Sequence, residues 1–324
     1  MTYVKGSVIS AADINSFTGI TGTAAPDSAT ATGKIGYLSG IGYGDRGYGA
    51  LSPAIIPNIT AGQSIGFEWF AMRIVLGQLY NWQGNISGLM PPSSAFASKA
   101  AIIAHERDAP SLNAYDLPDL ISMLDTNRFD YKIENMTLDA NLSTSTRAST
   151  WGAGNSGITA EFSVTFASEN AARYFFNTGG DIRLSLNHPS TASSRDSSWN
   201  AILDNLTVAF KAHDSVRLSG TSGTASSIGY YELTTAYQTI LDGANSGTGM
   251  YTSNDFTISA KAQTITGLNG AKGNVIYFKV QLIDEQTNAF SDIVQGGTNS
   301  SISLLRAAGS YSVIAPTVSV VTAF

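Results

Sequence analysis

The sequence contains no cysteine, and this absence removes several kinds of chemistry at once. Disulfide bonds, thiolate nucleophiles and cysteine-ligated metal sites all require that residue. The three histidines, His105, His188 and His213, are dispersed and form no H-x-x-x-H or H-E-x-x-H pair of the kind that holds a metal on a helix. We therefore expect no metal and no other cofactor, and we expect the histidines to be ordinary surface or loop residues.

Charged side chains are also scarce. Asp, Glu, Lys and Arg make up 13 % of the 324 residues, about half of the ~25 % that is usual in soluble proteins. The 18 basic and 24 acidic residues give a net charge of −6, which argues against nucleic-acid binding because phosphate neutralisation needs positive charge. Low charge is typical of the cores of subunit interfaces, so we expect a homo-oligomer with other protein partners.

Long hydrophobic runs are missing as well. The most apolar stretch, residues 65–82, contains Glu68, Arg73 and Gln78 and does not predict a membrane-spanning helix. The amino terminus, MTYVKGSVISAADINSF, lacks the basic start and apolar stretch of a signal peptide. We therefore expect a chain that is made in a cytoplasm and has no membrane partner.

One glycine-rich string resembles a nucleotide-binding motif by spelling alone. GYGDRG at 42–47 fits G-x-G-x-x-G, but Gly49, Pro53 and Pro57 follow where that motif needs a helix. The phosphate loop G-x-x-x-x-G-K-[ST] does not occur in the sequence. The string therefore predicts a flexible or tightly turned loop, with no bound nucleotide.

Two pairs of neighbouring carboxylates are candidates for a catalytic pair. Asp116 and Asp119 fit the start of a helix, where acidic groups offset the helix dipole. Asp284 and Glu285 fit a hairpin turn between strands. Both interpretations are favoured over a glycosidase pair, whose separation of ~5–10 Å depends on tertiary structure. We expect no enzyme activity and assign no catalytic residue.

The first half of the chain shows little strand periodicity. Residues 1–62 are rich in small and polar side chains and are expected to form an extended N-terminal arm. Residues 63–150 are expected to form a small helical or irregular region. Apolar positions recur at spacings of three and four over 64–83, and more weakly over 117–127, so each of these segments predicts a helix.

From residue 151 onward, apolar and polar side chains alternate with period two. ITAEFSVTF at 158–166 places every second residue, from Ile158 to Phe166, on one face. A short helix over 169–177 is expected to be capped by Ser168 and ended by Gly179. The fold class is therefore mainly β (α+β), with a sandwich-like antiparallel domain over 151–324. Further strands are expected at 181–186, 206–210, 256–260, 274–283 and 316–324.

Aromatic residues supply the candidate contact sites. Tyr37, Tyr43 and Tyr48 lie in a Gly-rich tract in which no periodicity buries them. Tyrosine is enriched at interfaces, so these three are candidate assembly contacts, although packing over the chain's own core explains them equally well. Phe175 and Phe176, in the short helix, are expected in the core.

Two stretches resemble virion structural proteins of tailed bacteriophages. One is FASENAARYFFNTGGDIRLSL at 166–186, preceded by WGAGNSGITAEFSVTF at 151–166. The other is the G-Y-G tract GYGDRGYGALSPAIIP, followed by the Trp-containing segment IGFEWFAMRIVLGQLYNW. The resemblance spans most of residues 37–190 and implies a structural part of a virus particle, with no active site.

Three functions remain open at this point. The resemblance favours a structural component of a virion, in the tail or baseplate, made in the host cytoplasm; a capsid or neck decoration protein is a variant of the same idea. The second is a receptor- or carbohydrate-binding fibre or spike module. In that case Trp151 and Trp199 are candidates for stacking on host surface glycans. The third, a polysaccharide-degrading enzyme, has no supporting group of residues.

Overall fold

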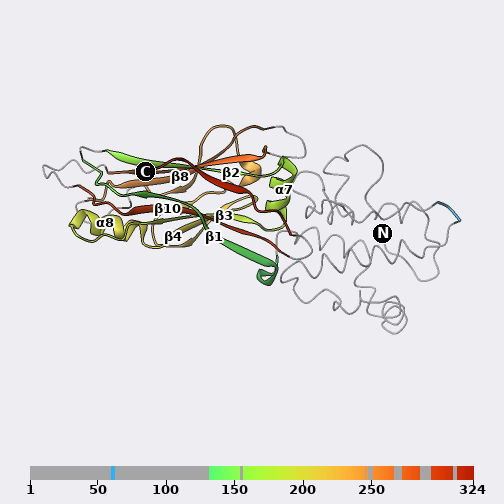
Figure 1. The fold of residues 1–324 in the computed structure, drawn as a ribbon, viewed down its shortest axis with the longest axis horizontal. Helices are drawn as coiled ribbons and strands as arrows, with labels where there is room; N and C mark the ends of the chain where they lie inside the picture. The colour runs from blue at the N-terminus through green and yellow to red at the C-terminus, as the bar shows by residue number, and fades with distance from the viewer. Residues whose placement is uncertain are drawn as a thin grey trace.

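The computed structural model describes residues 60–62, 131–153, 156–244, 246, 251–265, 272–284, 293–308 and 312–324. In these residues two antiparallel sheets pack face to face as an elongated sandwich (Figure 1). This arrangement confirms the mainly β, sandwich-like fold class. The arm over 1–62 (apart from 60–62), the helices expected at 64–83 and 117–127, and Tyr37, Tyr43 and Tyr48 lie outside the described residues.

The first sheet contains five strands and the second contains six. The first has the order β1-β10-β3-β4-β5 and the second the order β11-β2-β9-β8-β7-β6. The strands of the first sheet are β1 (Met136–Arg147), β3 (Asp181–Asn187), β4 (Leu206–Phe210), β5 (Ser215–Ser219) and β10 (Thr298–Ala307). Those of the second are β2 (Gly157–Thr165), β6 (Thr224–Ala225), β7 (Gln238–Asp242), β8 (Asp255–Ala262), β9 (Val275–Ile283) and β11 (Thr317–Thr322).

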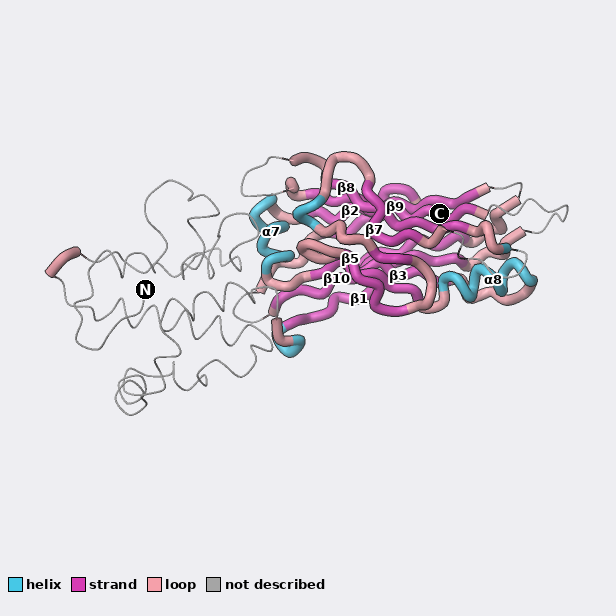
Figure 2. The backbone as a smooth tube through the Cα atoms, turned by 180° about the vertical axis from the view of Figure 1, so that it is seen from behind, coloured by secondary structure: helices cyan, strands magenta, loops and turns pink. Residues whose placement is uncertain are grey.

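Two α-helices lie at opposite ends of the sandwich (Figure 2). The helix α7 (Glu169–Asn177) connects β2 in one sheet to β3 in the other, whereas α8 (Ser194–Leu203) connects the neighbours β3 and β4. The described residues also include the 3-10 turns η3 (Ile133–Asn135), which precedes β1, and η4 (Tyr230–Glu232), which lies between β6 and β7. None of the helices in the described ranges is long and apolar enough to cross a membrane.

The helix α7 forms as its local sequence predicts. The side chain of Ser168 accepts a hydrogen bond from the amide of Ala171, which satisfies one of the free N–H groups at the start of the helix. After the last turn, Gly179 adopts a φ of +87°, a left-handed conformation that side-chain-bearing residues rarely take. Phe175 and Phe176 are fully buried, as expected.

The core forms where the alternating apolar residues of the two sheets meet. On β2 the inward positions from Ile158 to Val164 are buried, and the intervening polar side chains point outward. At the α7 end the core is aromatic, with Phe176 at its centre. Its ring stacks on that of Tyr230, with centroids 4.5 Å apart, and has edge or tilted contacts with three phenylalanines. These are Phe166, Phe175 and Phe210.

The sandwich begins upstream of the boundary that we expected at residue 151. Strand β1 pairs along its length with β10, from Met136 opposite Ala307 to Arg147 opposite Thr298. Residues 136–147 therefore belong to the first sheet and not to the small helical or irregular region expected over 63–150. Their alternation is hidden in the sequence because β1 is an edge strand with mostly exposed or half-buried side chains.

The two edge strands β1 and β11 lie beside each other, and both carry irregularities. The pairing of β1 shifts between Asp139 and Ser143, where Asn141 has a φ of +50°, and that of β11 shifts between Val320 and Thr322. The amide of Phe324 donates to Ser145 Oγ at 2.8 Å and links the two edges. Bulges of this kind prevent another strand from extending the sheet.

A buried polar cluster at the α8 end as the candidate functional site

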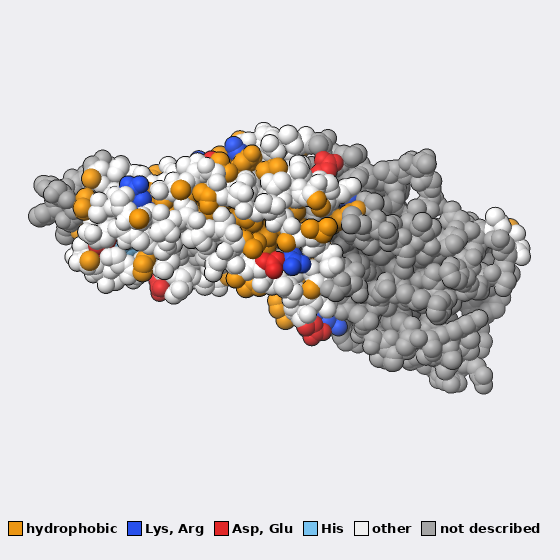
Figure 3. Space-filling view, viewed as in Figure 1, with side chains coloured by type: hydrophobic (Ala, Val, Ile, Leu, Met, Phe, Trp, Pro, Cys, Tyr) orange, Lys and Arg blue, Asp and Glu red, His pale blue; other side chains and the backbone are white. Residues whose placement is uncertain are grey.

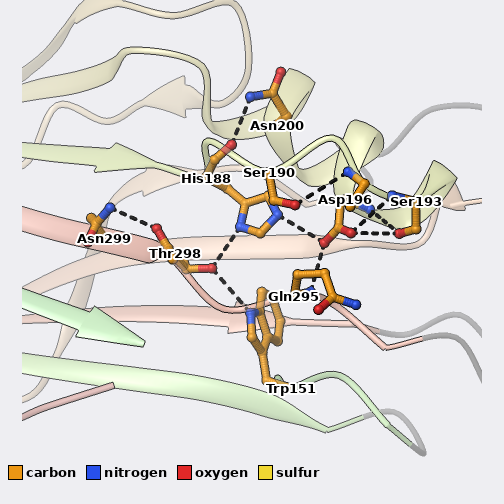
Figure 4. A network of polar contacts seen from close by, with 11 residues as sticks. Trp151, His188, Ser190, Ser193, Asp196, Asn200, Gln295, Thr298 and Asn299 are labelled. Carbon is orange, nitrogen blue, oxygen red and sulfur yellow. Dashed lines mark hydrogen bonds and ion pairs between the residues drawn. The ribbon is translucent and has the colours of Figure 1, made fainter. Parts of the chain in front are cut away.

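The largest group of buried polar side chains lies where α8 covers one end of the sandwich (Figure 4). Its members come from segments far apart in the sequence, namely the end of β3, the first turns of α8 and the start of β10. Trp151 joins the cluster through an antiparallel bridge with Val294, with N–O distances of 3.0 and 2.8 Å. Because side chains from several distant segments converge here, this cluster is the candidate functional site.

Three residues of the cluster line up as hydroxyl, imidazole and carboxylate. Thr298 Oγ1 lies 2.9 Å from His188 Nδ1, and His188 Nε2 lies 3.2 Å from Asp196 Oδ1. The indole Nε1–H of Trp151 can only donate, and it donates to Thr298 Oγ1 at 3.2 Å. The order of groups is that of a hydrolase triad.

Hydrogen bonds and burial together indicate how Thr298, His188 and Asp196 are protonated. The carboxylate of Asp196 accepts from the amide of Gln295 at 2.7 Å and from both the amide and the hydroxyl of Ser193, at 3.1 and 2.8 Å. The carboxylate oxygen of Asp196 can only accept, so His188 donates to it from Nε2. Burial lowers the pKa of His188 and favours the neutral imidazole, in which Nδ1 accepts the hydroxyl proton of Thr298.

A second buried group adjoins the first. Arg195 Nη1 lies 3.1 Å from Asp284 Oδ2, with side chains 3 % and 0 % exposed. The Asn254 amide, in the orientation that satisfies its neighbours, donates to Asp284 Oδ1 at 2.8 Å and accepts from Trp199 Nε1 at 3.1 Å. The Arg195 guanidinium also lies 5.5 Å from the centre of the Tyr251 ring. This second group links α8 to the ends of β8 and β9.

The burial of the cluster decides what it can do. Thr298, His188 and Asp196 are each 0 % exposed, so no substrate can approach the hydroxyl group of the triad-like line. A nucleophile must be within reach of the atom that it attacks. We conclude that this polar cluster has a structural role, because its hydrogen bonds and one ion pair hold α8 against both sheets.

Several sequence-based expectations need correction here. Trp151 and Trp199 are 4 % and 0 % exposed and lie 5.0 Å apart, centre to centre, so neither ring can stack on a sugar. The expectation that the histidines lie at the surface or in loops is wrong for His188, which is fully buried. Asp284 serves a buried ion pair instead of a hairpin turn, because β9 and β10 lie in different sheets.

Burial of His188 predicts a dependence of stability on pH. Burial lowers the pKa of His188 below its ordinary 6.5, and the opposing effect of Asp196 is smaller. Below pH ~6.5 the unfolded chain therefore binds a proton that the folded chain does not, and stability falls by at most about 1.4 kcal/mol per pH unit. Denaturant unfolding between pH 7.5 and 5.5 measures this loss.

The matched control for this prediction is His188→Gln, which cannot titrate. Asp181 acts in the opposite direction, because burial raises the pKa of its carboxyl and stability then increases as the pH falls through that pKa. The difference between wild type and His188→Gln removes this contribution. If the difference does not change between pH 7.5 and 5.5, the neutral, buried imidazole is the wrong description.

A shallow pocket of about 270 Å³ lies at the opposite end, beside α7. It combines aromatic, glycine and polar lining, with Lys211 and Asp214 on its wall together with His213. The His213 ring lies 5.1 Å from that of Tyr231 and bonds Glu232 through Nδ1 at 2.9 Å. These contacts hold the imidazole against the adjoining turn η4 and account for its position without a ligand.

Metal binding and relationships to known proteins give no further assignment. Across the described ranges, no three His, Asp or Glu side chains come together in a way that could hold a metal ion. Comparisons of the chain with protein-family models, with curated proteins and with solved structures produce no match. The functional argument therefore depends on the sequence resemblance and on the surfaces of the sandwich.

Proposed function

We propose that this protein is a structural subunit of a tailed-bacteriophage virion, in the tail or baseplate, that assembles with copies of itself and with neighbouring virion proteins. The virion setting rests on the resemblance of residues 151–186, which fold as β2, α7 and β3. The proposal of self-assembly is supported by the surface of the sandwich, where charged groups are few and apolar side chains gather in the middle of one face (Figure 3).

The observation that carries the assembly proposal is a row of exposed apolar side chains on the two adjoining edge strands. Leu138 and Leu142 on β1 are 50 % and 44 % exposed, and Val320 and Val321 on β11 are 36 % and 51 % exposed. We call these four residues the edge patch. Exposed apolar side chains gathered on neighbouring strands are typical of protein–protein contacts.

The chemistry of the edge patch fits a second copy of the same chain. Its neighbouring charges, Asp139 and Arg306, are already paired with each other. An uncharged apolar surface is complementary to itself, which is what a two-fold contact between identical subunits requires. The bulges in β1 and β11 exclude a continuous intermolecular sheet, so the contact is expected to form through side chains.

Removing apolar surface from the edge patch should weaken self-association. We expect Leu142→Ser combined with Val321→Ser to shift the chain from oligomer toward monomer, because each subunit would then bury less apolar area on association. Light scattering coupled to size-exclusion chromatography over a range of concentrations measures the distribution.

The opposite edge supplies the control. Leu218 on β5 has the same residue type and the same 44 % exposure as Leu142 but lies on the far edge of the first sheet. Leu218→Ser should leave the oligomer intact. A monomeric wild-type chain, or equal effects of the substitutions at both edges, would contradict assembly through the edge patch.

A further inference from the structure

A cluster of tyrosine and lysine side chains lies on the outer face of the six-stranded sheet, on and beside β8 and β9. Lys261 on β8 and Lys279 on β9 approach the same ring, that of Tyr237, with each Nζ 4.5 Å from its centre. Lys261 Nζ also lies 5.2 Å from the ring centre of Tyr277. The two Nζ atoms are therefore no further apart than the sum of their two 4.5 Å distances from the centre of the Tyr237 ring.

The carboxylate nearest to these lysines is bound elsewhere. Glu161 on β2 lies directly opposite Lys279 in the pairing of β2 with β9, where a cross-strand ion pair would be the ordinary arrangement. Instead, its Oε1 accepts a hydrogen bond from the hydroxyl of Tyr237. Burial, and then the carboxylate of Glu161, raise the pKa of Tyr237, so this hydroxyl remains a donor.

As a result, two positive charges are held near each other on this face. Neither Lys261 nor Lys279 forms an ion pair with a carboxylate among the residues that the structure describes. The face of the Tyr237 ring offsets part of their mutual repulsion through cation–π attraction. An anionic group placed between the two ammonium groups would offset the remaining repulsion between them.

Apart from Glu161, the outward side chains around the lysine pair on β2 and β9 are polar and uncharged. The outward positions that flank it on β2 and β9 carry hydroxyl and amide groups, and the Tyr277 ring lies beside them. Hydroxyl and amide groups on a flat sheet can bond the hydroxyls of a sugar, and a tyrosine ring can pack against its apolar face. The flanking residues are Thr159, Ser163 and Gln281.

From this arrangement we propose that the outer face of the six-stranded sheet binds an anionic saccharide, with its carboxylate held between Lys261 and Lys279 and its ring beside Tyr277. Tyr237 is a positioning residue, because its hydroxyl keeps Glu161 away from Lys279. The site does not depend on assembly through the edge patch. It replaces Trp151 and Trp199 as the place where the chain would contact a glycan.

The direct test is a titration of the full-length chain with a trisaccharide of galacturonic acid, followed by calorimetry at low salt. We expect saturable binding that weakens as salt is added, and no binding of the neutral galactose trisaccharide. Lys261→Gln combined with Lys279→Gln should weaken binding about tenfold or more, while Lys132→Gln, at a distant lysine, should not. Thermal unfolding of each variant checks that the sandwich is intact.

The positioning role of Tyr237 has its own signature. Tyr237→Phe removes one hydroxyl, frees Glu161 to pair with Lys279, and should weaken binding severalfold although both lysines remain. Adding Glu161→Gln to Tyr237→Phe removes the competing charge and should restore binding. A merely structural role for Tyr237 predicts no such recovery.

Three results would overturn the proposal. The first is wild-type binding that does not distinguish the acidic from the neutral trisaccharide. The second is equal binding by wild type and the double lysine variant. The third is binding of hexaglutamate or inorganic phosphate as tightly as the acidic trisaccharide, which would identify a general anion site with no preference for sugars.

Discussion

Asp284→Asn is expected to lower the free energy of unfolding by about 3–5 kcal/mol, because it breaks a buried ion pair and leaves a buried positive charge. The guanidinium of Arg195 lies 3.1 Å from the carboxylate of Asp284, and both side chains are almost fully buried. The substitution keeps the shape of the side chain and removes only its charge. Urea unfolding monitored by tryptophan fluorescence measures the loss.

A half-buried ion pair at the edge of the first sheet provides the comparison. Asp139 and Arg306 pair there with side chains 22 % and 25 % exposed. Pairs that remain in contact with solvent contribute about 0–1 kcal/mol, so Asp139→Asn should cost far less than Asp284→Asn. Replacing both buried partners, with Arg195→Met and Asp284→Leu, should recover much of the stability. Equal losses of unfolding free energy in Asp284→Asn and Asp139→Asn would contradict the structural role of the polar cluster at the α8 end.

Phe176→Ala is expected to destabilise the sandwich by about 3–5 kcal/mol, as is usual when a buried aromatic ring is removed. Phe176 is 0 % exposed, and its ring contacts four other aromatic rings from α7, β4 and the adjoining turns. The variant would leave a cavity where the two sheets and α7 meet. The shift in the midpoint of denaturant unfolding measures the effect.

Two further variants separate packing from the mere presence of phenylalanine. Phe176→Leu keeps most of the volume and should cost less than about 1.5 kcal/mol. Phe324, which packs only at the margin of the core, should tolerate alanine better than Phe176 does. Because Phe176 and Asp284 lie at opposite ends of the sandwich, their effects should add. A cost at Phe324 as large as that at Phe176 would show that the aromatic centre is not the main packing site.

Strand β2 could be predicted from the sequence, and strand β10 could not. Strand β2 reads as a strand because its inward positions are all apolar. In β10 the inward positions include Thr298 and Ser300, both fully buried, so the apolar alternation breaks over half of the strand. Those polar residues are buried because partners from other elements reach them, and such partners are invisible to a local pattern.

The same reason explains why α8 and its polar cluster escaped prediction. The helix buries Arg195, Asp196 and Ser198 as well as Trp199, so it has no apolar stripe. Its local signal was the capping box between Ser193 and Asp196, a pattern that marks a helix start. The partners His188 and Asp284 lie close only after both sheets have formed, and no spacing in the sequence connects them.

The lysine pair illustrates a third kind of limit. Lys261 and Lys279 each look like ordinary outward residues of a strand, and Tyr237 lies directly before β7. Only the pairing of β8 with β9 and the position of the segment before β7 bring them together. Residue type alone therefore pointed to Trp151 and Trp199 as sugar contacts, although both rings are buried.

A reconstruction, at side-chain resolution, of the particle whose genome encodes the chain would test whether the chain is a structural subunit of that particle. We expect multiple copies of the sandwich in the tail or baseplate, with Leu142 and Val321 covered by a neighbouring copy and Lys261 and Lys279 facing outward. A particle that contains no copy of the chain would contradict the account, and so would copies whose edge patch faces solvent.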